Sequence, residues 1–475
     1  MKICLITTMT PTSENIRGTS ALPYHLIKGF NNFNDSGNLY DRNINDNGNS
    51  SIGTGTDKHF ELQTHNIEIF TFNNNGLSNE KIAEVEKELD VKINVVPLPK
   101  WFLFVFRFKL FFIRLFMKYP IHHYVKLPQQ YVNEIKSKEP DVIWVYGAEW
   151  SRVVNQFKGF RRIHTLPDSE ALYYYRMLSR RFVINDWKKF WRCALMYPKF
   201  LRLERDFDNS EQIMYHLVGE KDAEFLRNIN PNINAKFLRH PHYEINGNVN
   251  DNGNSGKHKS EVLTDEAPRG GQKTSDVLRE SAIANDNGIH ADNTNNNFKS
   301  KKFHSPKIKL LIAGQYNLYM KQDGDLLVEQ INDNANYLKE HYSITFLGKG
   351  WEKHVETLRV AGFEVEHIWF AQDYIEEICK HDIQITPISI GTGTKGKVLD
   401  ALANGLLVIG TPYAMENIAV KNGESCVEYK EAKEVIDILR DIPQYLFKYE
   451  KMAEEGRRCV LEYHNREKIA RELFG

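Results

Sequence analysis

The chain alternates between short apolar, often β-branched runs and longer segments in which apolar residues recur every three or four positions. Runs of the first kind occupy 2–8, 141–146, 162–166, 307–314 and 383–387. They are typical of strands buried on both faces of a parallel sheet, and the longer segments have the spacing of amphipathic helices. Strands that alternate with helices in this way predict an α/β fold with a doubly wound parallel sheet in each half of the chain.

The clearest strand–helix unit lies at 382–427. Its sequence predicts a buried strand at 383–387, a glycine loop, a helix at 395–404 and another strand at 406–410. A helix N-terminus presents free N–H groups and a partial positive charge, and glycine lets the backbone approach a ligand closely. The unit therefore predicts an anion-binding site. Its loop residues are Gly391, Thr392, Gly393 and Thr394.

Charged residues at the start of this helix extend the prediction to a nucleotide diphosphate. Lys395 and Lys397 add two positive charges that would stabilise a leaving diphosphate, so both are predicted catalytic groups. Asp400 follows about 7 Å further along the helix axis, which resembles the separation between a diphosphate and the ribose hydroxyls of a nucleotide. The hypothesis places the phosphates on the loop and lysines, and the ribose on Asp400. The similar string IGTGTDK at 52–58 follows no strand, so the context supports the site and the string alone does not.

The segment TPISIGTGTKGKVLDALANGLLVIGT at 386–411 resembles the donor-site segment of the GT-B fold glycosyltransferases of group 1. The resemblance covers the C-terminal domain well and the N-terminal domain loosely. It implies an α/β GT-B fold, in which two Rossmann-like doubly wound domains face each other across a cleft. It also implies transfer of a sugar from a nucleotide-diphosphate sugar to a glycan or lipid-linked acceptor, with retention of anomeric configuration, no required metal and no further cofactor.

By this resemblance Asp400 takes the place of a Glu that binds the donor ribose. Many members have a second Glu where this chain has Thr392. The run HTLPDSEALYYYR at 164–176 resembles bacterial group 1 sugar transferases with Asp-Ser near this point, and other members have a catalytic His there. These two departures leave an alternative open, namely a catalytically inactive GT-B protein that binds nucleotide or membrane as a scaffold.

Four further site residues are predicted from their places at strand ends and in the first loop. Gly314 and Gly348 end predicted strands and would line the donor pocket, although ordinary strand-to-helix turns explain them equally well. Gly18 lies in the first loop, which faces the cleft in the resembling family, but it would also suit the start of a helix. Asp168 is a predicted catalytic group, with helix capping by Asp168 or Ser169 as the alternative.

An aromatic and basic segment lies at 100–118. Between 91 and 133 the sequence has no acidic residue and seven basic ones, and WFLFVFRFKLFFIRLFMKY is dense in aromatic side chains. As one helix, the segment would place Lys100, Arg107, Arg114 and Lys118 on one stripe, with the aromatic side chains free to enter a membrane interface. It is too short and too charged to span a bilayer, so it predicts docking on an anionic membrane surface. The alternative is a core helix with a solvated basic edge.

Composition limits the remaining possibilities. The chain has 475 residues, zero formal net charge and 41% hydrophobic residues, which indicates two globular domains and disfavours nucleic acid as a partner. Five scattered cysteines without C-x-x-C spacing indicate reduced thiols in the cytoplasm and no structural zinc, so we expect a cytoplasmic protein, peripheral on the cytosolic face of a membrane. The expected organisation is an N-terminal acceptor domain at 1–242 with a disordered insert at 31–58, a disordered Asn-rich linker at 243–305, a nucleotide-sugar-binding domain at 306–454, and a C-terminal helix at 455–475 that packs back on the first domain.

Overall fold

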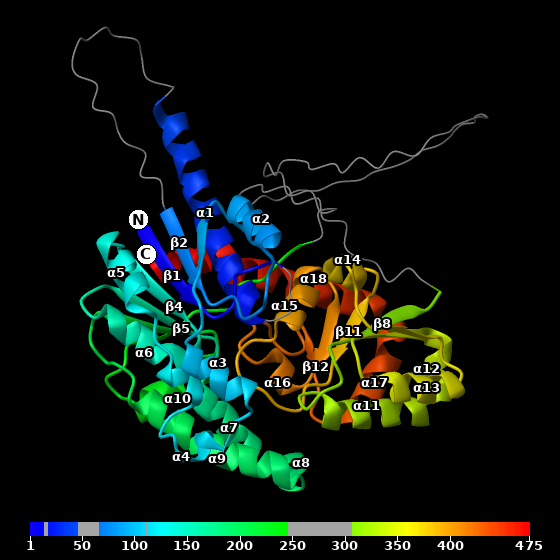
Figure 1. Ribbon diagram of the computed structural model, residues 1–475. Helices are drawn as coiled ribbons and strands as arrows, with labels where there is room; N and C mark the ends of the chain where they lie inside the picture. The colour runs from blue at the N-terminus through cyan, green and yellow to red at the C-terminus, as the bar shows by residue number, and fades with distance from the viewer. Residues whose placement is uncertain (14–17, 46–65, 111, 246–305) are drawn as a thin grey trace, which may run out of the picture. The chain divides into compact units, whose positions relative to one another are not determined.

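The computed structural model describes residues 1–13, 18–45, 66–110, 112–245 and 306–475 (Figure 1). Residues 46–58 of the predicted insert and nearly all of the predicted linker lie outside these ranges, as does the IGTGTDK string. The described residues form two parallel sheets with helices on both faces of each, and both sheets belong to one compact unit.

The first sheet has seven parallel strands in the order β3-β2-β1-β4-β5-β6-β7. Helices cover both faces of this sheet, and its strands are correspondingly buried: Leu5, Ile69 and Trp144 are fully buried, and so are the polar side chains of His164 and Thr165 in β5. The chain moves outward from β1 to β3 and returns to β4 on the other side of β1, which is the doubly wound arrangement that the sequence predicts. The strands are β1 (Lys2–Thr7), β2 (Asn66–Thr71), β3 (Lys92–Val95), β4 (Val142–Tyr146), β5 (Arg162–Leu166), β6 (Ile213–Leu217) and β7 (Ala235–Phe237).

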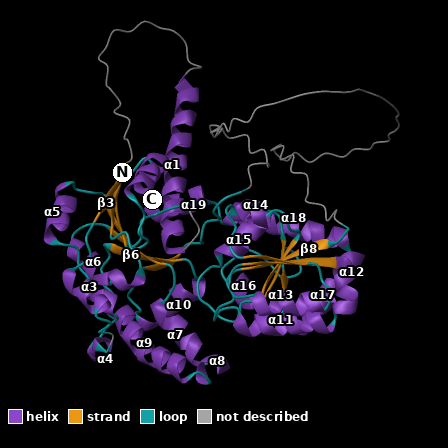
Figure 2. Ribbon diagram, turned by 45° about the vertical axis from the view of Figure 1, so that its right-hand side comes forward, coloured by secondary structure: helices purple, strands orange, loops and turns teal. Residues whose placement is uncertain are grey.

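The second sheet has six strands in the order β10-β9-β8-β11-β12-β13. Figure 2 shows it nearly edge-on, with α11 and α15 on opposite sides. Its chain likewise leaves the first strand in one direction and returns beside it, because β11 pairs with β8. The strands are β8 (Ile308–Ala313), β9 (Tyr342–Leu347), β10 (Val365–Ile368), β11 (Ile383–Thr386), β12 (Leu407–Gly410) and β13 (Val427–Glu428). The predicted fold class of two doubly wound parallel-sheet domains is confirmed.

The helices that accompany the two sheets are also amphipathic. Those of the first half are α1 (Gly18–Asn45), α2 (Asn79–Leu89), α3 (Lys100–Arg107), α4 (Ile113–Phe116), α5 (Gln129–Ser137), α6 (Ser151–Val154), α7 (Glu170–Leu178), α8 (Arg181–Ile184), α9 (Trp187–Arg205) and α10 (Glu220–Ile229). Those of the second half are α11 (Lys321–Asp333), α12 (Ala335–His341), α13 (Glu352–Val360), α14 (Tyr374–Ile378), α15 (Gly396–Ala403), α16 (Pro412–Met415), α17 (Ala432–Asp441), α18 (Leu446–Tyr463) and α19 (Arg466–Phe474).

The end of the chain packs on the first sheet. The Phe474 ring in α19 lies 5.2 Å from the ring of Phe30 in α1 and 5.0 Å from that of Trp144 in β4. Arg161 also donates a hydrogen bond of 3.1 Å to the carbonyl oxygen of Gly475. The last helix thus completes the hydrophobic core beneath β1 and β4.

Three elements differ from the sequence prediction. Gly29 predicts the end of the first helix, and the insert after it is predicted to be disordered, but α1 continues to Asn45, because extending a helix that is already packed costs far less than starting one. The apolar pattern over 326–340 predicts a single helix, which the structure divides into α11 and α12 at Asn334. The third difference, in the aromatic and basic segment, affects its proposed role.

The aromatic and basic segment forms two short helices, α3 and α4, instead of one continuous helix. Lys109 lies between them with φ 52°, a left-handed conformation that ends α3. Aromatic side chains favour helices weakly, and tertiary contacts override them here. Lys199 of α9 donates hydrogen bonds to the carbonyls of Arg114 (2.6 Å) and Met117 at the end of α4. The stripe of four cations expected on one helix face is therefore not formed.

Among the described residues, no helix has the length and apolar character needed to cross a membrane.

The close approach of two strand ends in the second sheet gives a stability prediction. Gly348 has φ 134°, and a Cβ there would lie 2.6 Å from the carbonyl oxygen of Gly314. We expect Gly348→Ala to lower the free energy of unfolding by about 2–4 kcal/mol through backbone strain and overlap. Gly76→Ala is the control, because φ is 67° but no atom lies within 4 Å of the added Cβ; it should cost about 1 kcal/mol. Equal losses in urea unfolding would contradict the predicted overlap.

Candidate functional site

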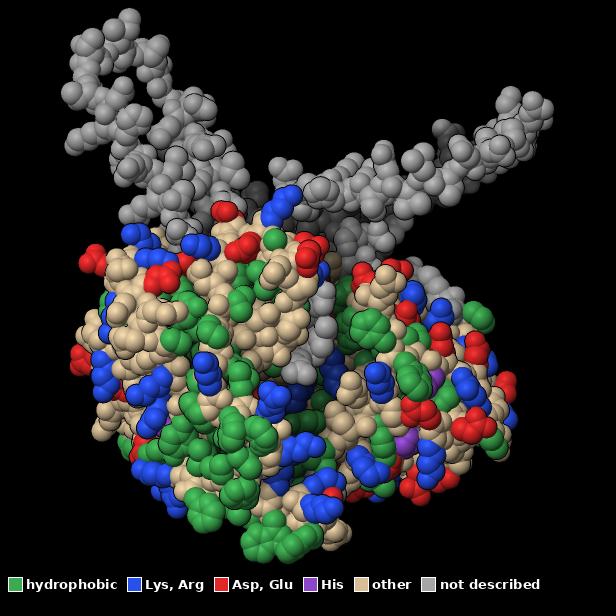
Figure 3. Space-filling model, viewed as in Figure 1, with side chains coloured by type: hydrophobic (Ala, Val, Ile, Leu, Met, Phe, Trp, Pro, Cys, Tyr) green, Lys and Arg blue, Asp and Glu red, His purple; other side chains and the backbone are tan. Residues whose placement is uncertain are grey.

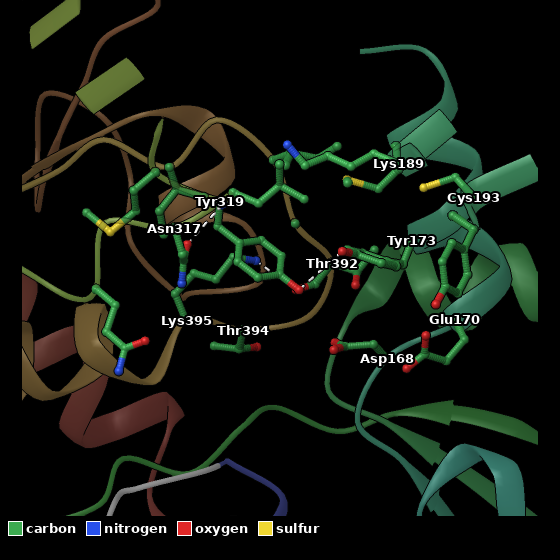
Figure 4. A pocket seen from close by; sticks show the side chains of 18 of the residues that line it. Asp168, Glu170, Tyr173, Lys189, Cys193, Asn317, Tyr319, Thr392, Thr394 and Lys395 are labelled. Atoms are coloured by element: carbon green, nitrogen blue, oxygen red, sulfur yellow. Dashed lines mark hydrogen bonds between the residues drawn. The ribbon is translucent and has the colours of Figure 1, made fainter. Parts of the chain in front are cut away.

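A cavity of about 850 Å³ lies beyond the carboxyl ends of β5, β8 and β11 (Figure 4). The strands β8 and β11 are neighbours from which the chain runs in opposite directions, so the cavity lies at the topological switch point of the second sheet, where α/β proteins bind ligands. Residues from both halves of the chain line it. They are Asp168, Glu170, Tyr173, Tyr174, Met177, Lys189, Arg192, Cys193, Gln315, Asn317, Leu318, Tyr319, Met320, Ile388, Ile390, Gly391, Thr392, Thr394, Lys395 and Lys397.

The glycine loop and the start of α15 form the wall of the cavity on the side of the second sheet. Lys395 precedes α15, and its ammonium group donates hydrogen bonds of 2.8 Å to the carbonyl oxygens of Thr392 and Gly393 in its own loop. Burial lowers the pKa of Lys395, and the nearby Asp168 carboxylate opposes that shift. The cation is thus held at the cavity wall by weak neutral acceptors that a phosphate could replace.

Lys397 reaches the same wall from the first turn of α15. Its ammonium group donates a hydrogen bond of 3.0 Å to the carbonyl oxygen of Ala313, at the end of β8, and lies 3.0 Å from the Met320 sulfur. Burial, reinforced by repulsion from Lys395, lowers the pKa of Lys397 to about 8. Two cations that repel each other beside a cavity form a site where an anion would relieve the cost of both charges.

The sequence left open whether Asp168 is a catalytic group or whether Asp168 or Ser169 caps a helix, and the structure gives the two residues different positions. Ser169 caps α7, because its hydroxyl accepts a hydrogen bond from the Leu172 amide. Asp168 lines the cavity from the end of β5. Burial and the nearby Asp222 carboxylate raise the pKa of Asp168 to about 7, while Lys395 opposes the rise. Asp168 is therefore a carboxyl group that changes protonation near neutral pH.

Gly393 allows Asp168 to lie against the glycine loop. The residue has φ 62°, and a Cβ at this position would overlap the Asp168 carboxylate. Its amide also faces the buried carboxylate of Asp222, at 3.4 Å, and the other oxygen of Asp222 accepts a hydrogen bond of 2.9 Å from the Ser169 amide. A side chain at 393 would separate the loop from both acids.

An ion pair joins the two halves of the chain beside the cavity. Arg176 of α7 donates two hydrogen bonds of 2.9 Å to the Glu416 carboxylate and one of 2.7 Å to the Gly391 carbonyl. The Arg176 and Glu416 side chains are only 14% and 8% exposed. A two-pronged pair with little water access holds the glycine loop against α7. The Tyr319 and Tyr173 hydroxyls form a further contact between the halves, at 3.3 Å.

The structure brings most of the predicted loop and charged residues to one cavity and leaves others apart from its lining. Gly391, Thr392, Thr394, both lysines and Asp168 line the cavity. Gly314 and Gly348 lie at the ends of β8 and β9 and pack against each other. Gly18 is the first residue of α1.

Asp400 lies on the buried side of α15 and is 1% exposed. Burial raises the pKa of Asp400 to about 8, and the nearby Glu244 carboxylate raises it further, while a hydrogen bond from the Tyr243 backbone opposes the rise. This carboxyl group is not among those lining the cavity. Its assignment to the ribose stays a prediction.

Sequence reasoning missed Asp222, Glu416 and the specific role of Arg176. Asp222 follows β6 and Glu416 follows β12, so both come after carboxyl ends of parallel strands, as Asp168 does. That position was a usable signal, although Asp222 is also a common type of residue in a helix first turn. Arg176 was visible only as one of several basic residues, because its partner lies 240 residues away.

Comparisons with known proteins identify the second half of the chain and the fold. Residues 322–475 match the model of the glycosyl transferase-like family. No curated protein matches the sequence.

Solved glycosyltransferase structures match nearly the whole chain. HepE of Anabaena, solved in complex with UDP, has a TM-score of 0.53 at 9% identity and covers 99% of this chain and 98% of its own. WaaG, a glycosyltransferase involved in lipopolysaccharide biosynthesis, has a TM-score of 0.54 at 11% identity and covers 100% of both chains. Sucrose-phosphate synthase of Thermosynechococcus elongatus has a TM-score of 0.56 at 11% identity and covers 99% and 96%. At these identities the likeness shows a shared fold.

The low pKa of Lys397 gives a second prediction. In the unfolded chain this lysine keeps its proton up to about pH 10.5, whereas in the folded protein it does so only up to about pH 8. Its destabilising effect is therefore complete below pH 8 and disappears as the pH rises toward 10.5. We expect Lys397→Met to raise Tm by a few degrees at pH 7, corresponding to about 1–3 kcal/mol, and to raise it less at pH 10. A lower Tm at pH 7 would show that the ammonium group stabilises the empty site.

Proposed function

We propose that this chain is a group 1 glycosyltransferase with the GT-B fold. It would transfer a sugar from a nucleotide-diphosphate sugar, with UDP-sugars as the first candidates, to an acceptor in the cavity at β5, β8 and β11. The single observation that supports this most is the pair of lysines, Lys395 and Lys397, that line the cavity at the start of α15. The uridine base is suggested by HepE, which binds UDP.

The donor diphosphate would lie on the glycine loop and the first turn of α15. Lys395 now donates to carbonyl oxygens of Thr392 and Gly393, and a phosphate oxygen is a stronger acceptor for the same ammonium group. The helix start adds N–H groups and a partial positive charge. Binding an anion here would restore the pKa of both lysines toward ordinary values, so the unfavourable burial of their charges becomes donor affinity.

Transfer requires stabilisation of the leaving diphosphate. The bond between the sugar C1 and the phosphate oxygen breaks, its electron pair stays on the diphosphate, and the acceptor oxygen forms a new bond to C1. Lys395 and Lys397 would stabilise the growing negative charge. We propose that the reaction retains the anomeric configuration and needs neither metal nor further cofactor, as the group resemblance implies.

Asp168 is placed to handle the acceptor proton. Its carboxyl group lines the cavity at the end of β5, against the glycine loop that precedes Lys395. Its pKa of about 7 lets it accept a proton from a hydroxyl and release it afterwards. The proton can then pass to the diphosphate. Because only the ionised carboxyl accepts a proton, turnover that depends on Asp168 decreases as the pH falls below about 7.

We also propose that residues 100–118 dock on an anionic membrane surface. Although the predicted stripe of cations is absent, the exposed apolar side chains of α3 and α4 remain, and Figure 3 shows hydrophobic side chains gathered over these helices with Lys and Arg beside them. Phe104 is 53% exposed, Phe108 56%, Phe112 60%, Leu115 59% and Phe116 86%. Aromatic side chains beside basic ones favour the interface of an anionic bilayer.

The alternative of an inactive scaffold is less well supported. A scaffold would not need a carboxyl group with a pKa near 7 in the same cavity as two cations. The lining of the cavity does not explain the two departures from the family pattern that suggested a scaffold, namely Thr392 in place of a Glu and Asp-Ser where other members have a catalytic His.

Ligand-induced stabilisation tests the donor site. At a hundredfold excess over its Kd, a nucleotide sugar should stabilise the wild type by about 2.7 kcal/mol, seen as a rise in Tm. We expect UDP-glucose or another UDP-sugar to act and ADP- and GDP-sugars to act less. Lys395→Ala should remove most of the shift, whereas Lys421→Ala, on an exposed loop, should keep it. Asp400→Asn measures the ribose assignment separately.

Turnover of the stabilising sugar completes that test. Lys395→Ala with Lys397→Ala should lower kcat by about 10²-fold or more, because each removes charge stabilisation from the transition state. Stabilisation without any turnover would favour the scaffold. Absence of stabilisation by all three nucleotide classes would refute the donor site.

Vesicle flotation tests the membrane surface. We expect the protein to bind vesicles that contain anionic lipid and not pure phosphatidylcholine. Phe104→Ser with Phe116→Ser should reduce binding about tenfold or more, given the apolar area removed from the interface. Phe447→Ser is the matched control, because this ring is 68% exposed on α18. Binding that is independent of lipid charge, or equal loss in the control, would contradict the proposal.

A further inference from the structure

The helix α9 has two different sides, one that lines the cavity and one that is exposed and aromatic. Lys189, Arg192 and Cys193 line the cavity. Trp187 and Trp191 are 69% and 54% exposed. At about 100° per residue the two tryptophans and the cavity residues occupy opposite sides of the first two turns. The same short stretch of helix therefore combines cations at the cavity with large apolar side chains in solvent.

The C-terminal part of α9 is attached to the end of α4. Lys199 of α9 is only 4% exposed and donates to the carbonyls of Arg114 and Met117, which fixes the end of α4 on α9. Lys118 adds an ion pair of 3.2 Å with Asp206, the residue that follows α9. Figure 3 shows hydrophobic side chains over α3 and α4 and near α8 and α9 on the same face of the protein, and we call the exposed apolar side chains of these helices the aromatic surface. Its exposed members are Trp101, Leu103, Phe104, Phe106, Phe108, Phe112, Leu115, Phe116, Ile184, Trp187 and Trp191.

The aromatic surface and the entrance to the cavity are on the same face of the protein. In Figure 3, hydrophobic side chains lie over α3 and α4 and near α8 and α9, and a hollow with Lys and Arg at its edge lies beside them. Lys189 is 44% exposed and forms an ion pair of 2.9 Å with Asp186, the residue that caps α9. Glu170 is the acid on this part of the lining. A molecule bound in the interface could extend its polar end past the start of α9 into the cavity.

The charged side chains on the α9 side of the cavity differ from what a neutral sugar acceptor needs. A neutral glycan is usually bound by hydrogen bonds to polar side chains, whereas Lys189 and Arg192 offer two positive charges on successive turns of one helix. A phosphate is the group such a pair recognises best. Charge complementarity also sets the occupant of the aromatic surface, because exposed aromatic side chains with Lys and Arg beside them fit an anionic bilayer.

We propose that the acceptor is an anionic lipid, whose phosphate-bearing headgroup enters the cavity between Lys189 and Arg192 while the aromatic surface lies in the membrane interface. The inference rests on the proposed function, since it names the acceptor of the same cavity. It assigns Lys189 and Arg192 to acceptor binding, on the α9 side of the cavity, and leaves the donor to Lys395 and Lys397.

A water-soluble lipid separates headgroup binding from general attraction to a membrane. Dihexanoyl-phosphatidylglycerol, titrated calorimetrically below its aggregation concentration, carries a phosphate, free hydroxyls and two short chains. We expect it to bind the wild type, and dihexanoyl-phosphatidylcholine to bind at least tenfold more weakly. Lys189→Gln with Arg192→Gln should weaken binding of the anionic lipid at least tenfold. Lys188→Gln is the matched control, because this lysine is exposed on the same helix but does not line the cavity.

Two further arms identify the source of the phosphate and the role of the aromatic surface. Glycerol 1-phosphate has the headgroup without chains and should bind at least tenfold more weakly than the lipid; equal binding would show a soluble phosphate acceptor and overturn the proposal. Trp187→Ser with Trp191→Ser should reduce flotation with vesicles of phosphatidylcholine and phosphatidylglycerol at least tenfold. If the wild type bound no vesicles but self-associated, and the two tryptophan substitutions abolished that self-association, the aromatic surface would be a protein interface.

Each variant is also tested with UDP, so that failure of the acceptor and failure of the donor can be told apart. The UDP-induced rise in Tm should be unchanged by the Lys189 and Arg192 substitutions, which also shows that the variants fold. Equal lipid binding by the double variant and Lys188→Gln would overturn the acceptor assignment whatever UDP does. Lack of a UDP effect in the wild type would count against the donor site, and the lipid titration, done without nucleotide, would still decide the acceptor.

Discussion

The cost of holding two positive charges together beside one cavity is the constraint on which the site depends. Lys395 and Lys397 lie at the start of α15 with lowered pKa values and only carbonyl oxygens and a sulfur as direct partners. Such a pair is stable only because the rest of the fold supplies compensation: the loop carbonyls, the Asp168 carboxylate beside the glycine loop, and cores beneath both sheets. A bound diphosphate would offset the same cost directly, so the unfavourable charge of the empty site and the affinity for donor have one physical origin.

The second organising contact joins the two sheets. Arg176 holds Glu416 and the Gly391 carbonyl at once, which places a helix of the first half against the glycine loop of the second. In the proposed function, α7 and α9 would form the acceptor side of the cavity, and β8, β11 and α15 would form the donor side. For the proposed sugar transfer, a cavity enclosed by both halves of the chain would limit water access, and it contains Asp168 beside the glycine loop as well as both lysines.

The exposed aromatic side chains of the first half lie near the side of the cavity that α7 and α9 form. Lys199, nearly buried, uses its ammonium group to fix α4 on α9, and the exposed aromatic side chains of both helices lie on the same face of the protein as the cavity entrance. A membrane would then act as more than an anchor, because a helix that touches the interface also lines the acceptor side. Among the described residues that line the cavity, the side formed by β8, β11 and α15 has one aromatic side chain, Tyr319.

The sequence by itself determined both sheets, the strand–loop–helix unit at 382–427 and the lysines of the anion site, because apolar periodicity, glycine and helix-start charges act over a few residues. Only the tertiary structure decided how 100–118 folds, since Lys199 lies some 80 residues away, and which acids meet the loop, since Asp222 and Glu416 approach it from other strand ends. It also placed Asp400 on the buried side of α15, where helix spacing gave the distance along the axis but not the direction of the side chain. Contacts between residues distant in the sequence depend on how the helices and sheets pack together. The local sequence pattern does not show which distant residues will meet.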